Sequence, residues 1–399
     1  MNLSNRARTL RPSPTLTIDA RVKDMLRHGA DIISLGAGEP DFDTPVSVVN
    51  AAHSAALAGK TKYTAVGGIL ELRTAIAKHL RKTHAIDVEP SNIVITNGAK
   101  QALYNSLQTL VDDGDEVIII APYWVSYPEM IELSGGRPVT VHAVNARFEP
   151  DAGAVEKAIT SKTRGIILNT PNNPTGAVYS KSTLEGIVRI ARERNLWILS
   201  DEIYEMLVYD GLQHISPASV GGEGLARTIV ASGFSKSFAM TGWRLGYMAA
   251  PKHVADAAVA IQGQITSNVN TPTQWAGLEA LAINPADQKA MITEFQARRT
   301  LLVDGLTKAL RKDINIPVPQ GAFYLFMDAR PYLHKRFREI LIQTDTDLAA
   351  AILDHARVAL VPGSAFASPG FIRMSYATSR ENLLKSIDRL GAFFRELEG

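Results

Sequence analysis

Five short segments combine chemically different side chains with a position directly after an apolar, β-rich run. They are residues 97–100, 121–124, 170–176, 201–204 and 232–236. Together they offer a helix N-terminus, an aromatic face, an amide, a carboxylate, a phenol and a primary amine. A lysine amine can form an imine with an aldehyde, and this set could surround a small aromatic ligand that carries one.

Each group has a use if that ligand is a phosphorylated pyridine aldehyde. A helix N-terminus with small residues presents free backbone N–H groups to a phosphate. An aromatic ring can stack on the pyridine. A carboxylate beside the ring nitrogen keeps it protonated, so that the ring acts as an electron sink. An amide and a phenol can hydrogen-bond a ring oxygen, and the amine can form the imine and later move a proton.

The elements that must position these segments are alternating strands and helices. Strands are predicted at residues 92–96, 116–120, 165–169, 196–200, 228–231 and 245–249, with helices such as 101–110 and 182–194 between them. This alternation is typical of βαβ units and a mostly parallel sheet covered on both faces. Because ligands of such sheets lie beyond the carboxyl ends of the strands, the five segments are expected to share one edge.

After about residue 284 the pattern changes. A charged helical stretch, 286–310, begins after Pro285 and precedes short strand-like runs at 322–327, 358–361 and 371–375, and a last helix is expected at 380–397. We therefore predict an arm and first part of a small domain at 1–45, a large α/β domain at 46–285 and a small α+β domain at 286–399.

The composition of the chain excludes some kinds of site and gives no support for some kinds of partner. The chain has 399 residues, a net charge of +2 and no cysteine. This excludes disulfides and thiolate sites, fits a cytoplasmic location, and gives no reason to expect nucleic acid or a membrane as a partner. No apolar run reaches the roughly 18 residues of a membrane span. The histidines show no metal-binding spacing, so we expect no metal site. The nearest pair, His79 and His84, is expected on a solvated helix face.

Several motifs resemble the class I/II aminotransferases, in the order that family has. The sequence Gly233-Phe234-Ser235-Lys236, continuing to Arg244-Leu245-Gly246, resembles the cofactor attachment site of that family. Asn173-Pro174-Thr175-Gly176, Asp201-Glu202-Ile203-Tyr204 and Gly36-Ala37-Gly38-Glu39-Pro40-Asp41-Phe42 resemble three further signatures. The likeness covers nearly the whole chain and is greatest to the bacterial aspartate aminotransferase branch, which carries Pro122-Tyr123-Trp124-Val125-Ser126-Tyr127-Pro128.

The resemblance implies the fold and the cofactor. It implies the fold of type I pyridoxal-phosphate-dependent transferases, with a mostly parallel seven-stranded sheet and a smaller α+β domain. Lys236 would carry pyridoxal 5'-phosphate (PLP) as a Schiff base and shuttle a proton. Asp201 would pair with the pyridine nitrogen, while Asn173 and Tyr204 would bond the ring oxygen and Trp124 would stack on the ring.

The resemblance also implies the phosphate and substrate contacts. Gly98, Ala99, Lys100, Ser235 and Arg244 would hold the phosphate. Tyr63 would reach it from a second subunit, which implies a homodimer. Arg373 would clamp the substrate α-carboxylate with help from Gly38, Asn173 and Trp124.

One departure bears on the substrate. In another aspartate aminotransferase branch an arginine of the second subunit reads the side-chain carboxylate, but this sequence has no arginine between Arg244 and Arg298. Lys100 is the candidate cation in its place. We expect amino transfer from L-aspartate to 2-oxoglutarate, with an aromatic or prephenate aminotransferase, or β-elimination or racemisation on the same scaffold, as alternatives. A transcription regulator is not favoured, because no helix-turn-helix segment precedes Gly36.

Plainer structural roles remain for single residues. Lys236 could be a solvated lysine, Asp201 a helix N-cap, Trp124 a core residue and Arg373 one half of an internal salt bridge. The prediction of a common site depends on all of them meeting in space.

Overall fold

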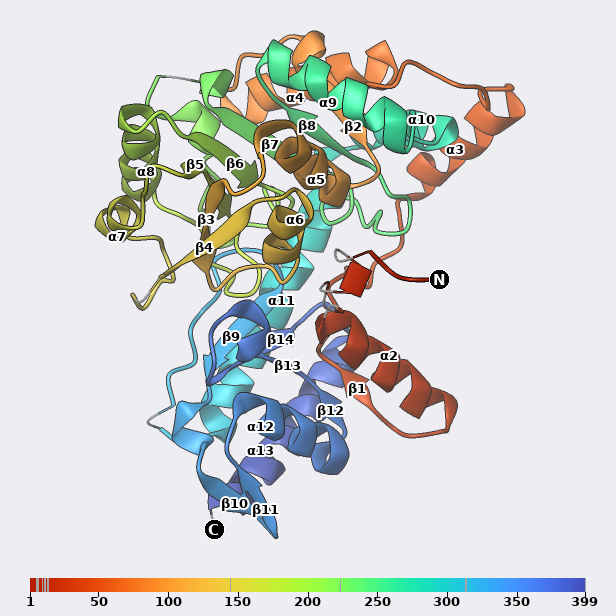
Figure 1. Cartoon of the computed structure of the whole chain (residues 1–399). Helices are drawn as coiled ribbons and strands as arrows, with labels where there is room; N and C mark the ends of the chain where they lie inside the picture. The colour runs from red at the N-terminus through yellow and green to blue at the C-terminus, as the bar shows by residue number, and fades with distance from the viewer. Residues whose placement is uncertain are drawn as a thin grey trace.

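The chain was analysed as a computed structural model, which describes residues 1–4, 7–8, 10, 12, 14–143, 145–222, 224–312 and 314–398. Figure 1 shows a larger layered unit built around the central sheet and a smaller unit that contains the C-terminus. None of the described helices combines the length and the apolar character that crossing a bilayer requires.

The larger unit contains a seven-stranded sheet with the strand order β2-β8-β7-β6-β5-β3-β4. Its strands are β2 (Ile93–Thr96), β3 (Glu116–Ala121), β4 (Arg137–His142), β5 (Thr163–Asn169), β6 (Trp197–Asp201), β7 (Thr228–Gly233) and β8 (Gly246–Ala249). Strand β8 is antiparallel to both neighbours, and the other paired strands are parallel. Six strands therefore run in one direction and end at the same edge, which confirms the predicted α/β architecture.

Helices cover both faces of this sheet, which explains why its strands are apolar throughout (Figure 1). In β3, Val117 and Ile119 pack in a cluster with α5, whereas Ile118 and Ile120 pack in a cluster with α8. The helices of the larger unit are α3 (Val46–Leu57), α4 (Leu70–His84), α5 (Ala99–Leu110), α6 (Tyr127–Leu133), α7 (Ala152–Lys157), α8 (Lys181–Glu193), α9 (Lys252–Ile265) and α10 (Thr271–Ala280). Alternate side chains of one strand thus fill two separate cores.

Strand β4 was not among the predicted strands. It is an edge strand that contains Pro138, and five of its six residues, all except Val141, are partly or fully exposed. A proline is tolerated at an edge because no outer neighbour needs its N–H, but it removes the continuous apolar run that marks the inner strands.

The smaller unit packs helices against a three-stranded sheet of order β13-β14-β9. Its elements are α2 (Pro14–Arg27), β1 (Ile33–Ser34), β9 (Tyr324–Asp328), β10 (Lys335–Phe337), β11 (Ile340–Ile342), α12 (Asp345–Ala351), β12 (Val358–Ala359), β13 (Val361–Pro362), β14 (Phe371–Ser375) and α13 (Arg380–Glu398). Strand β1 pairs in parallel with β12, so the N-terminal segment joins the C-terminal part of the chain.

A long helix, α11 (Pro285–Ala309), runs between the two units (Figure 1). It begins as the sequence indicates: the Asn284 side chain accepts a hydrogen bond from the Ala286 N–H, and Pro285 occupies the first turn. The domain boundaries at 45/46 and 285/286 stay our prediction. Short helical turns complete the chain: η1 (Pro90–Asn92), η2 (Pro217–Ser219), η3 (Gly224–Ala226), η4 (Arg330–Tyr332), η5 (Ile352–Ala356) and η6 (Gly363–Phe366).

The expectation that His79 and His84 lie on a solvated helix face is wrong. Their side chains are only 14% and 6% exposed, and both approach the buried carboxylate of Glu205. The segment after β6 packs over the last turns of α4 and buries the two histidines. The sequence of α4 alone does not predict this contact, because Glu205 comes from a distant segment.

Candidate active site

The five predicted segments follow β2, β3, β5, β6 and β7, and these strands all end at one edge of the sheet. The structure therefore places the amine, carboxylate, amide, phenol and aromatic ring on neighbouring loops. The smaller unit approaches the same edge, because Arg373 on β14 and Tyr324 on β9 both bond to residues of these loops.

Lys236 lies in the segment directly after β7. Its side chain is half-buried, and its amine donates a hydrogen bond to the Gly38 carbonyl of the N-terminal segment. Loss of hydration lowers the pKa of this amine from 10.5 to about 8; Glu39 opposes this, while Arg244 and Arg373 add to it. A larger fraction of Lys236 is therefore neutral and nucleophilic near pH 7 than for an ordinary lysine.

Asp201, the last residue of β6, is a buried carboxyl with neutral partners. It is 4% exposed, accepts a 2.7 Å hydrogen bond from the Tyr127 hydroxyl and accepts another at 3.2 Å from the Ile203 backbone N–H. Burial raises its pKa from 3.8 to about 6, and the Tyr127 hydrogen bond works against that rise. No cationic side chain lies within 4 Å of it in the described part of the chain. A cationic ligand group would supply the missing partner.

Arg373 is a buried guanidinium that no acidic side chain neutralises. It is 2% exposed; one terminal nitrogen donates to Asn173 Oδ1 at 3.0 Å and the other to the Gly36 carbonyl at 2.7 Å. Its Nε is buried without a partner, and no carboxylate of the described residues lies within 4 Å. The internal salt bridge considered for Arg373 is therefore absent there, and the guanidinium can receive a carboxylate ligand.

Tyr204 reaches the site from the segment after β6. Its hydroxyl lies 2.8 Å from the Tyr324 hydroxyl, and both rings are buried. Burial raises the pKa of both phenols above the ordinary value, so they remain neutral hydrogen-bond donors.

The N-terminus of α5 forms a second part of the site. Gly98 caps this helix with a φ of 76°, and among the described residues no side chain accepts a hydrogen bond as the cap of the helix. A Cβ at Gly98 would lie 2.6 Å from an Arg244 nitrogen, so the guanidinium sits directly against the glycine backbone. Ala99 and Lys100 open the helix, and Ser235 is buried beside Lys236 in sequence. Free N–H groups next to a guanidinium form an anion-binding corner.

Trp124 and Lys100 lie together at the opening of the site. The Lys100 amine lies 4.7 Å from the centre of the Trp124 ring and 3.3 Å from the Ser126 hydroxyl. Partial burial and the charge of Arg244 lower the pKa of Lys100. Trp124 is half-buried and packs edge-on against Tyr127 at 5.5 Å. The Trp124 ring therefore contacts both the hydrophobic core and the Lys100 cation.

A cavity of about 650 Å³ adjoins this opening. Asn97, Lys100, Ser126 and Arg244 line it together with apolar side chains that include Tyr104, Val125, Leu133 and Ile265. Tyr63 is not brought to the site within the chain: it is 90% exposed, and no hydrogen bond joins it to the described site residues.

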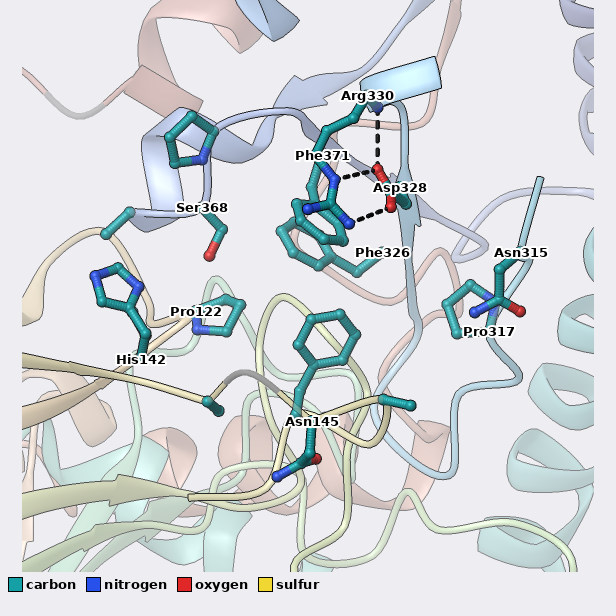
Figure 2. Close-up of a pocket in the computed structure, with 16 residues that line it drawn as sticks. Pro122, His142, Asn145, Asn315, Pro317, Phe326, Asp328, Arg330, Ser368 and Phe371 are labelled. Atoms are coloured by element: carbon teal, nitrogen blue, oxygen red, sulfur yellow. Dashed lines mark hydrogen bonds and ion pairs between the residues drawn. The ribbon is translucent and has the colours of Figure 1, made fainter. Parts of the chain in front are cut away.

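A second hollow of about 480 Å³ lies between the sheet edge and the smaller unit, as Figure 2 shows. His142 and Asn145 face it from the larger unit, and Phe371 and the bonded pair Arg330 and Asp328 face it from the smaller one. Neither Lys236 nor Asp201 lines it. It is therefore separate from the site described above.

Three residues of the site were not assigned a role from sequence: Tyr127, Tyr324 and Glu39. Tyr127 belongs to the Pro122–Pro128 motif, and its position three residues after Trp124 could have indicated that it lies near the site. Tyr324 is 120 residues from Tyr204, and nothing in the sequence links them.

These groups fit pyridoxal phosphate. The buried Asp201 lacks the positive partner that a protonated pyridine nitrogen provides, and the uncapped α5 N-terminus with Arg244 suits a phosphate. The Lys236 amine with its lowered pKa suits an aldehyde. The buried Arg373 leaves a cation for an amino acid carboxylate.

Comparisons with known proteins agree. Residues 30–390 match the family described as aminotransferase class I and II. The chain is 44% identical over 391 residues, 97% of each chain, to the aspartate/prephenate aminotransferase of Thermus thermophilus. The solved aspartate aminotransferase of that organism with maleate gives a TM-score of 0.91 at 42% identity, covering 98% of this chain and all of that one. The aspartate aminotransferase of Rhizobium meliloti gives 0.95 at 39% identity, covering both chains fully.

Proposed function

Because the chain belongs to the class I and II aminotransferase family, and is thus a PLP-dependent aminotransferase, we propose that it moves the amino group of L-aspartate to 2-oxoglutarate with Lys236 as the attachment and proton-transfer residue. The observation that carries the assignment of the residues is the pairing of a half-buried, low-pKa lysine with a buried, unneutralised aspartate on adjacent loops.

PLP, when bound, withdraws electrons from the substrate Cα and so makes its proton removable. Asp201 would keep a proton on the pyridine nitrogen, because its buried carboxylate and the positive charge on that nitrogen stabilise each other. Tyr127 holds the Asp201 carboxylate in place by its 2.7 Å hydrogen bond. Lys236 would hold the cofactor through its aldehyde, and its amine would be the group that moves the proton at the substrate Cα.

The remaining cofactor contacts are proposed from the family resemblance. Asn173 and Tyr204 would donate hydrogen bonds to the ring oxygen, and Trp124 would stack on the pyridine face. Backbone N–H groups of Gly98, Ala99 and Lys100, with Arg244 and Ser235, would hold the phosphate. The support for these roles is the convergence of buried or half-buried groups at the sheet edge.

Arg373 binds the substrate α-carboxylate. Its two terminal nitrogens are already oriented by Asn173 and the Gly36 carbonyl, so little side-chain entropy is lost on binding. The Gly38 carbonyl accepts the Lys236 hydrogen bond and lies two residues after Gly36, whose carbonyl holds Arg373, so the Gly38 backbone would help to orient the carboxylate.

Lys100 reads the distal carboxylate of aspartate. It is a cation at the opening of the site, and no acidic side chain within 4 Å neutralises it in the described residues. The Thermus thermophilus structure was solved with maleate, a dicarboxylate, which supports a dicarboxylic substrate for this chain as well.

A second substrate class is prephenate or an aromatic amino acid. The cavity beside Lys100 has an apolar wall as well as the cation, which suits a ring that carries a second carboxylate. The Thermus thermophilus relative is named for both aspartate and prephenate.

We also propose that the enzyme is a cytoplasmic homodimer. Tyr63 is 90% exposed, and the apolar side chains of Leu57 and Leu70 on either side of it are exposed too. A second copy would cover this region and bring Tyr63 to the phosphate. The cysteine-free composition is compatible with the reducing cytoplasm.

The test is a panel of amino donors with the wild type and Lys100→Met. We expect kcat/KM for aspartate to fall by about 10- to 100-fold in the variant, because one charged hydrogen bond is lost. Donors without a distal carboxylate should change little. The surface variant Lys252→Ala is the control. Absence of activity with aspartate and glutamate in the wild type would contradict the substrate assignment.

A further inference from the structure

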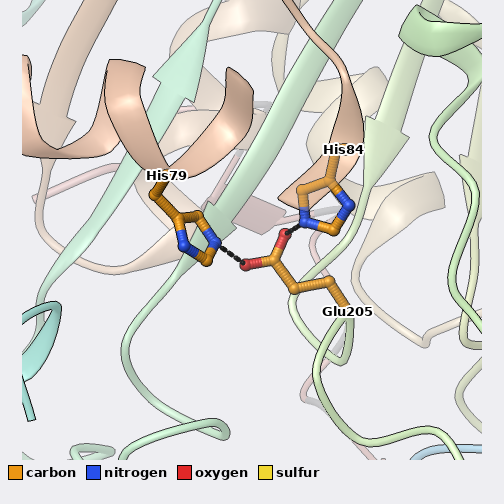
Figure 3. Close-up of side chains that lie close together, drawn as sticks. All are labelled: His79, His84 and Glu205. Carbon is orange, nitrogen blue, oxygen red and sulfur yellow. Dashed lines mark hydrogen bonds and ion pairs between the residues drawn. The ribbon is translucent and has the colours of Figure 1, made fainter. Parts of the chain in front are cut away.

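A buried cluster of two imidazoles and one carboxylate lies outside the proposed catalytic machinery. His79 and His84 come from the last turns of α4, and Glu205 follows Tyr204 directly in the segment after β6. Figure 3 shows both rings directed at the single carboxylate. His79 Nε2 lies 3.3 Å from Glu205 Oε1, and His84 Nε2 lies 3.0 Å from Glu205 Oε2.

The cluster has unmet bonding capacity. The His84 and Glu205 side chains are more than nine-tenths buried. His84 Nδ1 has no hydrogen-bond partner among the described residues, and the 3.0 Å contact between His84 Nε2 and Glu205 Oε2 is an ion pair only when the imidazole is protonated. A neutral His84 therefore leaves a buried ring nitrogen unpaired. Buried polar atoms in this condition are costly unless an ion or water joins them.

We propose that these three side chains bind one divalent cation of the zinc class. Two imidazoles and a carboxylate are a ligand set that zinc uses, and the imidazoles disfavour calcium and magnesium, which take oxygen ligands. Ligand atoms around a tetrahedral zinc ion are separated by about 3.4 Å, given metal–ligand distances near 2.1 Å. The two measured His–Glu separations are close to this value.

The third separation also allows a common ion. The ligand atoms of the three residues all lie within 4.8 Å of one another, and among the residues that the structure describes no other group of this kind occurs. Rotation of the imidazole rings about their side-chain bonds would bring the ligand atoms to the separation that a tetrahedral ion requires. His79 keeps 14% of its side chain exposed, so the cluster is not fully closed to solvent on that side, and a water would be the fourth ligand.

The bound cation would fasten α4 to the segment that carries the site residues. Glu205 is the next residue after Tyr204 and lies four residues beyond Asp201. The ion therefore stabilises the loop behind the site without contacting substrate or cofactor. This proposal is independent of the proposed substrate, and its failure leaves the aminotransferase assignment unchanged.

The experiment uses tag-free holoenzyme, treated with a chelator and freed of unbound PLP, which itself binds metals. Zinc is then titrated by calorimetry, and the content is measured by mass spectrometry of the metal. We expect one zinc ion per chain. Glu205→Gln and His84→Asn should each weaken zinc binding by about 100-fold or more. His253→Ala, which removes an exposed histidine from α9, should leave it unchanged.

A second measurement does not depend on the folding of a variant. Crystals of the wild type soaked in zinc should give an anomalous difference peak between His79, His84 and Glu205 that is present above the zinc absorption edge and absent below it. Substoichiometric zinc, a peak elsewhere only, or equal zinc affinity in a folded Glu205→Gln variant would overturn the proposal.

Discussion

The Tyr127 hydroxyl donates a 2.7 Å hydrogen bond to the carboxylate of Asp201, and both side chains are buried. This bond connects the segment after β3 to the end of β6. It stabilises the ionised carboxylate and so limits the rise in the pKa of Asp201 that burial causes. The hydroxyl is therefore placed to keep Asp201 negative for the pyridine nitrogen.

Removing that hydroxyl should weaken the pairing. In Tyr127→Phe we expect kcat to fall by about 10-fold and PLP to dissociate more readily, because one hydrogen bond to a charged group is lost. Steady-state kinetics and PLP titration of the apoenzyme measure both effects. Tyr123→Phe, four residues earlier on the same segment, is the control. An unchanged kcat in Tyr127→Phe would rule out the role of the bond.

The substitution Asp201→Asn should make the apoenzyme more stable and the enzyme less active. The pKa of Asp201 rises from 3.8 in an unfolded chain to about 6 in the folded one. The unfolded chain therefore loses this proton at a lower pH than the folded chain. As a result, the free energy of unfolding of the apoenzyme falls as the pH rises from about 4 to 6. This difference in pKa corresponds to about 3 kcal/mol.

Above pH 6 the apoenzyme of Asp201→Asn should therefore be more stable than the wild type by up to about 3 kcal/mol, while aminotransferase activity is largely lost. Denaturant unfolding at several pH values measures the first effect. The exposed residue Asp112 provides a control as Asp112→Asn. A variant apoenzyme that is less stable than wild type at pH 8 would contradict the account of a buried carboxylate without a positive partner.

Arg373→Lys should impair substrate binding more than cofactor binding. Lysine cannot reproduce two parallel bonds to a carboxylate and the contacts to Asn173 and Gly36. We expect kcat/KM for every amino donor to fall by about 100-fold, with PLP content unchanged. The control is Arg330→Lys, since Arg330 is a surface residue paired with Asp328. Equal losses in both variants would argue against a specific role.

Gly98→Ala tests the phosphate corner with a matched control. The new Cβ would approach the Arg244 guanidinium to 2.6 Å and displace it, so PLP affinity should fall by about 10-fold or more. Gly114→Ala has a similar positive φ, 86°, but nothing lies within 4 Å of its Cβ. Both variants carry the backbone strain, and only Gly98→Ala should lose PLP. Equal PLP affinity in the two variants would contradict a phosphate site at Gly98 and Arg244.

The sequence predicted the site edge because parallel strands bring their carboxyl ends together wherever they pair. Lys236, Asp201, Asn173 and the α5 N-terminus could therefore be grouped without knowing the strand order. Residues that contact each other across the two units could not be predicted in this way. The bond between Tyr204 and Tyr324, and the bond from Lys236 to Gly38, depend on how the smaller unit packs, which no local pattern encodes.

The histidines illustrate the same limit. His79 and His84 are five residues apart on α4, a spacing that does not place them on one helix face. They converge only because Glu205 arrives from another segment and the helix ends at His84. Strand β4 was missed for a different reason, since an edge strand with a proline lacks the apolar run of an inner strand.

The most direct test of the account is the identity of the lysine that carries the cofactor. Holoenzyme is reduced with borohydride, digested and analysed by mass spectrometry. The account predicts one pyridoxyl phosphate group per chain, on Lys236, and none in Lys236→Ala, whereas Lys252→Ala should keep it. A modified peptide that contains another lysine, or a Lys236→Ala enzyme that retains wild-type turnover, would contradict it.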